Sequence, residues 1–216
     1  MEGTQKRRYV SDLRREHAEA TRLRIAEAAR TLMIERGYAA TTMGDVAAAA
    51  GVAVQTLYAA CPGGKPGLVK IVYDVTLAGD GREVPQGGRP PVLAIIEEPD
   101  PVRKLALYAA MAVTIFGRIG PIHRVLRAAA AAGGTGIGDL LDETERQRRN
   151  GSRQLTQHLA EAGALRPGLN ADRAADEVFA LTSIEVYEQL TDVCEWTVDE
   201  YEDWLARTLA GTLLSS

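Results

Sequence analysis

Hydrophobic residues recur along the chain with the spacing of α-helices, and no stretch alternates between apolar and polar positions as a half-buried β-strand would. In the first strongly periodic segment, Ile25, Ala29, Leu32 and Met33 fall on one helical face, and Gly37 follows as a stop signal. Alanine, leucine, arginine and glutamate, all strong helix formers, dominate the sequence. The pattern therefore predicts an all-α protein.

A short helix is predicted directly after this first helix. Thr42 and Asp45 have the spacing of an N-terminal capping pair, in which the threonine oxygen accepts a backbone N–H. Gly51 ends the helix that they open.

A second short helix is predicted from Val54, Leu57 and Tyr58, which occupy positions i, i+3 and i+4. It ends near Pro62, and Pro66 suits the first turn of the helix after it. Two brief helices that meet at a tight glycine turn, behind a longer supporting helix, form a helix-turn-helix.

Glycine and proline are concentrated in residues 79–91, which predicts a connector between two domains, 1–78 and 79–216. Beyond the connector, the pattern of caps and prolines predicts several helices. Their expected starts are Asp100-Pro101, Gly120-Pro121, Asp139, Asn170 (a helix reaching about Asp192) and the Thr197–Glu200 capping box.

Charge is distributed unevenly along the 216 residues, whose net charge is −4. Residues 1–70 carry 11 Lys and Arg against 7 Asp and Glu, whereas residues 71–216 carry 14 against 22. A basic head, with a basic N-terminal arm around Lys6–Arg8, favours a polyanionic partner. Chance clustering of solvated charges is the alternative.

The composition, 46% hydrophobic and 25% charged, is that of a soluble globular protein. No apolar core follows the charged N-terminus, so no signal peptide is expected, and the longest apolar run, 105–116, is too short to span a bilayer. Two distant cysteines, Cys61 and Cys194, indicate neither a disulfide framework nor a metal site. These features predict a cytoplasmic protein without a membrane partner.

Motifs of enzyme chemistry are absent. His17, His123 and His158 lack metal-ligand spacing, "GGTGIG" lacks the glycine spacing of a dinucleotide loop, and Lys65 in "GGKP" is followed by proline rather than the Ser or Thr of a P-loop. No G-x-S-x-G occurs. We expect no catalytic residues, no metal and no cofactor.

Residues 21–69 resemble the DNA-binding domain of the TetR family of bacterial transcriptional regulators. The shared features are the Ala-Ala pair and Gly37 of the first helix, Thr41-Thr42, "A-x-x-A-G-V", "T-L-Y" and the lysine at 65. The resemblance implies an N-terminal three-helix helix-turn-helix domain and a C-terminal helical ligand-binding and dimerisation domain. It implies a homodimer whose second short helix lies in the major groove of operator DNA, and a small molecule that controls release.

The resemblance assigns DNA contacts to five positions, for which the side-chain chemistry is suitable: Thr42, Gln55, Thr56, Tyr58 and Lys65. A hydroxyl at a helix start can meet a phosphate, a glutamine amide can pair with adenine, and threonine can meet a thymine methyl. Capping alone for Thr42, solvation alone for Gln55 and Thr56, and ring packing alone for Tyr58 are the alternatives.

The chain departs from the family pattern in its helix-turn-helix. Cys61 stands where the family usually has an aromatic residue, Ala47–Ala50 offers no charge to phosphate, and the second short helix has no Lys or Arg. DNA affinity would therefore depend on Lys65, Arg22, Arg24 and the basic arm. Cys61 itself could be a redox sensor or a buried, inert thiol.

A ligand pocket in the C-terminal domain is expected among residues that combine apolar bulk with polar tips, although plain core filling would explain each of them. These candidates are Tyr108, Met111, Thr114, Phe116, His123 and Tyr187. Apolar stripes on the last two helices suggest either a dimer interface or a monomer core. The interface candidates are Val178, Thr182, Trp204, Leu205 and Leu209.

The sequence thus predicts a TetR-like regulator, a repressor that binds operator DNA as a dimer and is released by a small molecule. The alternative is a small-molecule binding protein that keeps the helix-turn-helix as a scaffold, without specific DNA binding.

Overall fold

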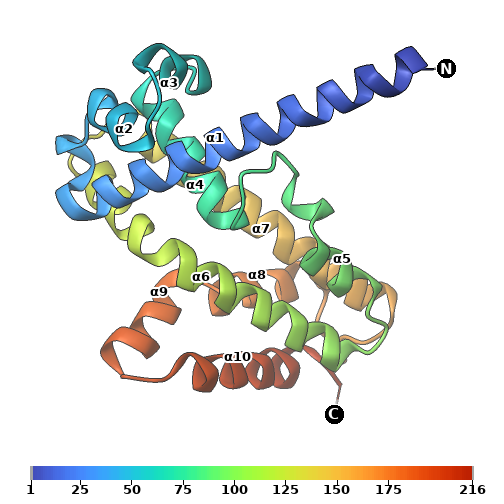
Figure 1. The fold of residues 1–216 in the computed structure, drawn as a ribbon. Helices are drawn as coiled ribbons and strands as arrows, with labels where there is room; N and C mark the ends of the chain where they lie inside the picture. Colours follow the sequence, from blue (N-terminus) through green and yellow to red (C-terminus); the bar gives the residue numbers. More distant parts are fainter. Residues whose placement is uncertain (1, 216) are drawn as a thin grey trace. The chain divides into compact units, whose positions relative to one another are not determined.

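The computed structural model describes residues 2–215, with side chains for Leu13 and for residues 15–215. All regular elements in this range are helices (Figure 1), which confirms the all-α prediction. The chain forms two compact units. The first unit comprises residues up to Glu83 together with Pro121–Leu140, and the second comprises Val84–Gly120 together with the residues from Leu141 onward.

The first unit contains four helices at its N-terminal end: α1 (Glu2–Ala40), α2 (Met43–Ala50), α3 (Val54–Ala60) and α4 (Lys65–Ala78). Helix α1 packs against α2 and α4, and α2 packs against α3. Their buried apolar side chains form one core, listed here by its largest members: Ile25, Met33, Val46, Leu57 and Leu68. This is the helix-turn-helix arrangement that the sequence predicts.

Local signals end and begin these helices as expected. At Gly37 the backbone leaves the helical conformation, with φ +81°. Gly51 adopts the left-handed conformation, with φ +64°, which glycine reaches without the steric cost of a Cβ. The Thr42–Asp45 capping box is present at the start of α2.

The second unit is built from α5 (Pro90–Glu97), the first part of α6 (Pro101–Ala131), most of α7 (Ile137–Glu161), α8 (Ala171–Leu181), α9 (Ile184–Glu188) and α10 (Val198–Leu213). A 3-10 turn η1 (Gln86–Gly88) precedes α5, and a π-helical turn η2 (Gln189–Val193) follows α9. Helix α10 packs against α8 and η2. The predicted caps at Asn170 and Thr197 are confirmed.

Three expectations about the helices were wrong. Helix α5 begins at Pro90, within the predicted connector, and was not foreseen. Helix α6 runs through Pro121, where a new helix was expected. A proline ring inside a helix crowds the backbone four positions earlier, and the residue there is Gly117. The helix expected from Asn170 to about Asp192 is broken after Leu181 and restarts at Ser183, the cap of α9.

Helix α6 is longer than the apolar run 105–116, which was expected to be too short to span a bilayer. Among residues 2–215 it is long and apolar enough to cross a membrane by length and composition, because the run 105–116 continues as helix on both sides. Half of its most apolar window is buried inside the protein, which is typical of a core helix.

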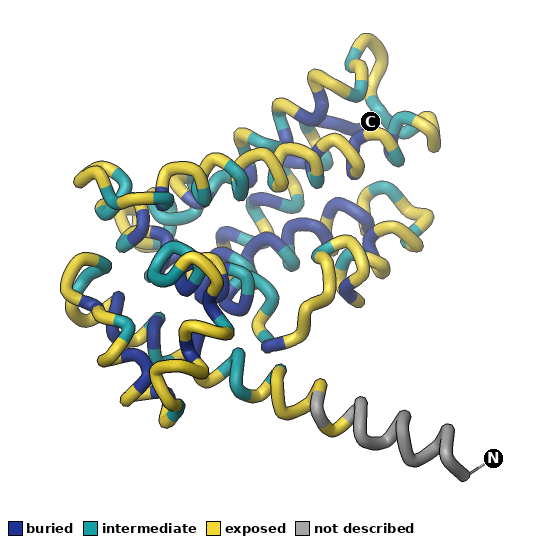
Figure 2. Tube along the Cα trace, turned by 90° about the horizontal axis from the view of Figure 1, so that it is seen from above, coloured by how far each residue is buried: buried dark blue, intermediate teal, exposed yellow. Residues whose placement is uncertain are grey.

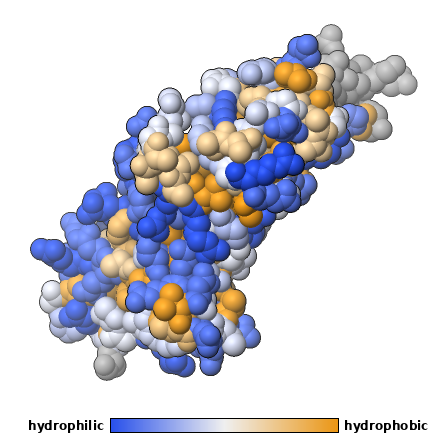
Figure 3. Space-filling view, turned by 90° about the vertical axis from the view of Figure 1, so that its left-hand side faces the viewer, coloured by the Kyte–Doolittle hydropathy of each residue, from blue (hydrophilic) through white to orange (hydrophobic). Residues whose placement is uncertain are grey.

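In the longer helices, buried and exposed positions recur in turn along the part that the structure describes (Figure 2). On the face drawn in Figure 3, hydrophobic areas are small and separated by hydrophilic ones. Broad apolar areas of the kind that mark large interfaces are not seen on this face.

Candidate nucleic-acid interface

Helix α3 turns one row of side chains inward and leaves the others on the surface. Leu57 and Cys61 are fully buried, with 0% exposure. Gln55, Thr56 and Tyr58 are exposed, the tyrosine by 53%. The helix thus presents three of the predicted DNA-contacting residues to the outside.

The apolar set from which α3 was predicted does not form one buried face. Leu57 is buried, but Val54 is 42% exposed and Tyr58 more so. The spacing correctly predicted a helix, and of the three side chains only that of Leu57 belongs to the core. The outward valine is the residue of this helix that sequence reasoning missed.

At the start of α2, Thr42 and Asp45 bind each other. The Thr42 Oγ1 accepts a hydrogen bond from the Asp45 backbone N–H at 3.1 Å and donates one to Asp45 Oδ2 at 2.7 Å. Hydrogen bonds from the Thr42 side chain and then its backbone lower the pKa of the Asp45 carboxyl. The capping role of Thr42 is confirmed, and its side chain is exposed, so a phosphate contact stays a prediction.

The side chain of Lys65, the first residue of α4, contacts the end of α1. Its Nζ donates a hydrogen bond to the Ala39 carbonyl at 3.2 Å and lies 4.2 Å from the centroid of the Tyr38 ring. Partial burial lowers the pKa of this ammonium. An ammonium has three donors, so one hydrogen bond leaves others for an anion.

Arg22 and Arg24, which were also predicted to bind phosphate, differ in how free their side chains are to do so. Arg22 is ion-paired with Glu83 at 2.6 Å and with Asp74 at 3.6 Å, an arrangement that joins α1 to α4 and the following connector. Arg24 is exposed. The side chains of Lys6–Arg8, the predicted basic arm, lie outside the described residues. The pairing of Arg22 gives it a structural role that the sequence did not indicate.

Cys61 fills a core position directly after α3. Burial raises the pKa of its thiol, and the positive charge of Arg22 opposes this shift only in part. A raised pKa leaves little reactive thiolate at neutral pH. The environment therefore favours the inert, buried thiol over the redox sensor.

The six predicted pocket residues do not form one group. In the second unit, Phe116 and Tyr187 are in ring contact, with centroids 5.5 Å apart. Tyr108 is buried, which raises the pKa of its hydroxyl, against hydrogen bonds with Ser152 and Thr182 that lower it. Met111 is half-buried, and Thr114 is exposed with its hydroxyl bound to its own helix.

His123, the sixth of these residues, belongs to the first unit, where its ring lies tilted against that of Tyr73 with centroids 6.4 Å apart. Another tyrosine of the second unit was missed as a pocket candidate. Tyr201 is fully buried, contacts Tyr187 edge-on at 5.0 Å, and its hydroxyl has no hydrogen-bond partner among the described residues. Burial raises the pKa of that hydroxyl.

Four of the five residues predicted to form a dimer interface are buried in the core of the single chain. Val178, Leu205 and Leu209 have 0% exposure and Thr182 has 2%, because α8 and α10 pack against each other and the rest of their unit. These side chains fill the core and offer no surface to a second copy. Trp204 is half-buried, in contact with Tyr201 at 5.6 Å.

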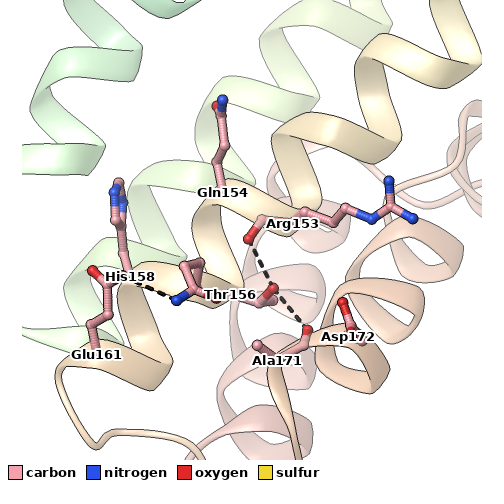
Figure 4. A pocket seen from close by; sticks show the side chains of 8 residues that line it. Arg153, Gln154, Thr156, His158, Glu161, Ala171 and Asp172 are labelled. Atoms are coloured by element: carbon pink, nitrogen blue, oxygen red, sulfur yellow. Dashed lines mark hydrogen bonds between the residues drawn. The ribbon is translucent and has the colours of Figure 1, made fainter.

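A polar hollow of about 400 Å³ lies between the end of α7 and the start of α8 (Figure 4). Arg153, His158, Glu161 and Asp172 line it, and Thr156 at its floor bonds the carbonyl of Ala171 at 3.0 Å. Its lining mixes both charge signs and its buried hydroxyl is already bound, so we assign it no ligand. Among the described residues, no group of three or more His, Cys, Asp or Glu could hold a metal ion.

Residues 25–62 match the family model described as bacterial regulatory proteins, tetR family. No curated protein matches the sequence.

Several solved structures share the fold. One is a putative TetR-family transcriptional regulator from Syntrophomonas wolfei, with a TM-score of 0.67 and 17% identity, covering 90% of this chain and 96% of that one. The fatty acid degradation regulator FadR from Bacillus halodurans has a TM-score of 0.63 and 18% identity, covering 87% and 97%.

NalD of Pseudomonas aeruginosa, the secondary repressor of the MexAB-OprM multidrug efflux pump, has a TM-score of 0.62 and 21% identity, covering 92% and 99%. At these identities the likeness shows the fold alone. The matched segment 25–62 spans the second half of α1, α2 and α3, which is the helix-turn-helix itself. Through this segment, the N-terminal part of the chain is similar to the tetR family of bacterial regulatory proteins.

Proposed function

We propose that this protein is a cytoplasmic transcriptional repressor that binds operator DNA as a homodimer and releases it when a small molecule binds the second unit. The observation that carries the proposal is the outward face of α3, where Gln55, Thr56 and Tyr58 are exposed while Leu57 anchors the helix in the core. A helix held in this way behind a supporting helix is the element that enters a major groove.

The proposed DNA contacts divide into two kinds. Gln55 and Thr56 would reach base edges, whereas Thr42, Tyr58 and Lys65 would bind phosphates and fix the register. Because α3 carries no cation and Arg22 is paired internally, few phosphate contacts are available. Specific affinity would therefore be modest and would depend on a small number of well-placed groups.

Ligand control is proposed for the second unit. The buried Tyr201 hydroxyl has no hydrogen-bond partner in the part of the chain that the structure describes, and a ligand could gain a hydrogen bond from such a group. Phe116 and Tyr187 lie in the same aromatic cluster. A ligand that changes the spacing of two α3 helices in a dimer would weaken binding to half-sites at fixed separation.

For the dimer, the half-buried Trp204 on α10 remains the candidate contact among the residues predicted from sequence. Repression rather than activation is proposed because one structure with this fold, NalD, is a repressor.

Gel-shift titrations of the full chain with the DNA upstream of its own gene, at several salt concentrations, test the function. Binding that survives excess competitor DNA supports a regulator. Competitor DNA that displaces the fragment at equal concentration would support the alternative, a small-molecule binding protein with an unused helix-turn-helix. Sedimentation at several protein concentrations tests the homodimer, and a monomer throughout would contradict it.

A further inference from the structure

We propose that Val54 is a specificity-determining residue, which packs against the C5-methyl group of thymine, and that α3 reads half-sites made of A·T pairs. This inference rests on the proposed function, since it names the class of DNA sequence that the same surface would select.

Val54 lies on the exposed side of α3, next to Gln55. Val54 is the first residue of α3, is 42% exposed, and follows Ala53, which provides no side-chain cap. Valine is a weaker helix former than alanine because its branched Cβ restricts the side chain in a helix. What distinguishes Val54 is its place beside Gln55 and Thr56 on the exposed side of α3, the surface proposed to meet the bases.

The chemistry of the whole outward face of α3 is consistent with one kind of base pair. Its exposed residues are Val54, Gln55, Thr56, Tyr58 and Ala59. Arginine and lysine, which read guanine, and aspartate and glutamate, which read cytosine, are absent from this helix. Glutamine pairs bidentately with adenine, and apolar groups contact the thymine methyl, so both available chemistries select A·T.

Helix α2 does not add a preference for another base pair. Its exposed residues are Gly44, Asp45, Ala48 and Ala49. Asp45 is the acidic one, and its carboxylate is held by Thr42 in the capping box, which withdraws it from cytosine. The alanines leave room for the DNA without specifying a base.

A protein partner fits this surface less well than DNA does. The exposed apolar side chains of α3 are Val54 and Tyr58, with polar residues between them, and this patch is far smaller than the roughly 1,000 Å² that a stable protein interface needs. The absence of acidic residues from α3 also avoids repulsion of phosphates.

The test begins with selection of bound sequences from a random duplex library by the full chain. We expect half-sites of A·T pairs. Each conserved thymine is then replaced by deoxyuridine, which removes only the methyl group. Loss of the methyl that Val54 contacts should weaken binding about fourfold, the value of one buried methyl group.

Variants assign that methyl to Val54. Val54→Ala should lose the same affinity on thymine DNA and become insensitive to deoxyuridine at that position, whereas Val54→Thr, which keeps one methyl, should be intermediate. Val198→Ala is the matched control, since Val198 is also the first residue of a helix and is 48% exposed. It should bind like the wild type.

The outcomes separate this inference from the function on which it rests. If a specific half-site is selected but its contacted pairs are G·C, or if deoxyuridine is neutral at every thymine, the Val54 inference is overturned and the regulator stands. If no sequence is enriched, the regulator proposal fails and the inference fails with it. Circular dichroism of the variants checks that each remains folded.

Discussion

The ammonium of Lys65 lies over the ring of Tyr38, 4.2 Å from its centroid, and donates a hydrogen bond to the Ala39 carbonyl. This contact fixes the start of α4 against the end of α1, and it holds a positive charge in place before any DNA arrives. A charge that is already positioned loses less side-chain entropy on binding a phosphate than a free one.

We predict that Lys65→Gln weakens binding to all DNA sequences alike and reduces the slope of log K against log salt by about 0.9, the value of one lost phosphate contact. Lys70→Gln is the control, because Lys70 is ion-paired with Asp74 at 3.1 Å on the same helix. Salt titrations of DNA binding measure both. Identical slopes for Lys65→Gln and the wild type would remove Lys65 from the interface.

Gln55→Ala and Tyr58→Phe are predicted to weaken operator binding while the thermal midpoint barely changes. Both side chains are exposed, and surface substitutions usually change stability by less than about 0.5 kcal/mol. Gln55→Ala should also relax selection for adenine at one position. Gel shifts and thermal denaturation check the pair, and a large stability loss with unchanged binding would mean that these side chains only support the fold.

The two cysteines are predicted to react at very different rates. Cys61 is buried with a raised pKa, and Cys194 is exposed. At pH 7 to 8, alkylation should label Cys194 in the native protein and Cys61 only after unfolding. Mass spectrometry of the labelled peptides makes the comparison. Rapid native labelling of Cys61 would instead support the redox-sensor alternative.

Arg148 is predicted to hold the break between α8 and α9. Its guanidinium stacks on the Phe179 ring at 3.6 Å and donates to the carbonyls of Phe179 at 2.6 Å and Thr182 at 3.2 Å. Arg148→Met should lower the free energy of unfolding by about 1–3 kcal/mol, since it leaves these acceptors without their donor.

The neighbouring Arg149→Met provides the control for this change. Arg149 makes a surface ion pair with Asp176 at 3.1 Å, in which both side chains are about half exposed. Such pairs contribute about 0–1 kcal/mol. Denaturant titrations compare the two variants, and equal losses would show that Arg148 is also only a surface charge.

Acid is predicted to weaken both capping boxes. Hydrogen bonds from Thr42 lower the pKa of Asp45, and those from Thr197 lower the pKa of Glu200. A carboxyl with a lowered folded-state pKa stabilises the protein fully above its unfolded value, about 4, and this contribution is lost as the pH falls through the folded value.

The thermal midpoint should therefore fall between about pH 5 and pH 3, where these groups take up protons. Glu200→Gln keeps a capping side chain but cannot titrate, so its midpoint should depend less on pH over the same range. Scanning calorimetry at a series of pH values provides the measurement. An unchanged pH dependence in this variant would show that Glu200 does not contribute.

Much of the first unit could be read from short stretches of sequence. The Thr42–Asp45 cap, the glycines at 37 and 51, and the second capping box at Thr197–Glu200 all lie where the sequence predicts them. Each involves residues within a few positions of one another, whose backbone conformation and hydrogen bonds depend mainly on local chemistry. The same local pattern carried the resemblance to the tetR family, which the family match confirms.

Features that depend on distant residues were not predictable in this way. Val54 and Leu57 are both apolar and lie in the same short helix, but only Leu57 is buried in the core of the first unit. The stripe on α8 and α10 suggested a dimer interface, with a monomer core as the alternative, and Val178 and Leu209 are buried within the single chain, where these two helices pack against each other.

By itself, the sequence determined that the chain is helical, where several helices begin and end, and which family its N-terminal segment resembles, because helical periodicity and capping act over a few residues. Only the tertiary structure decided which apolar side chains are covered and which remain on the surface. Burial depends on what distant parts of the chain bring to each helix face, and this also determined that Arg22 pairs with Glu83 and that Val54 faces outward.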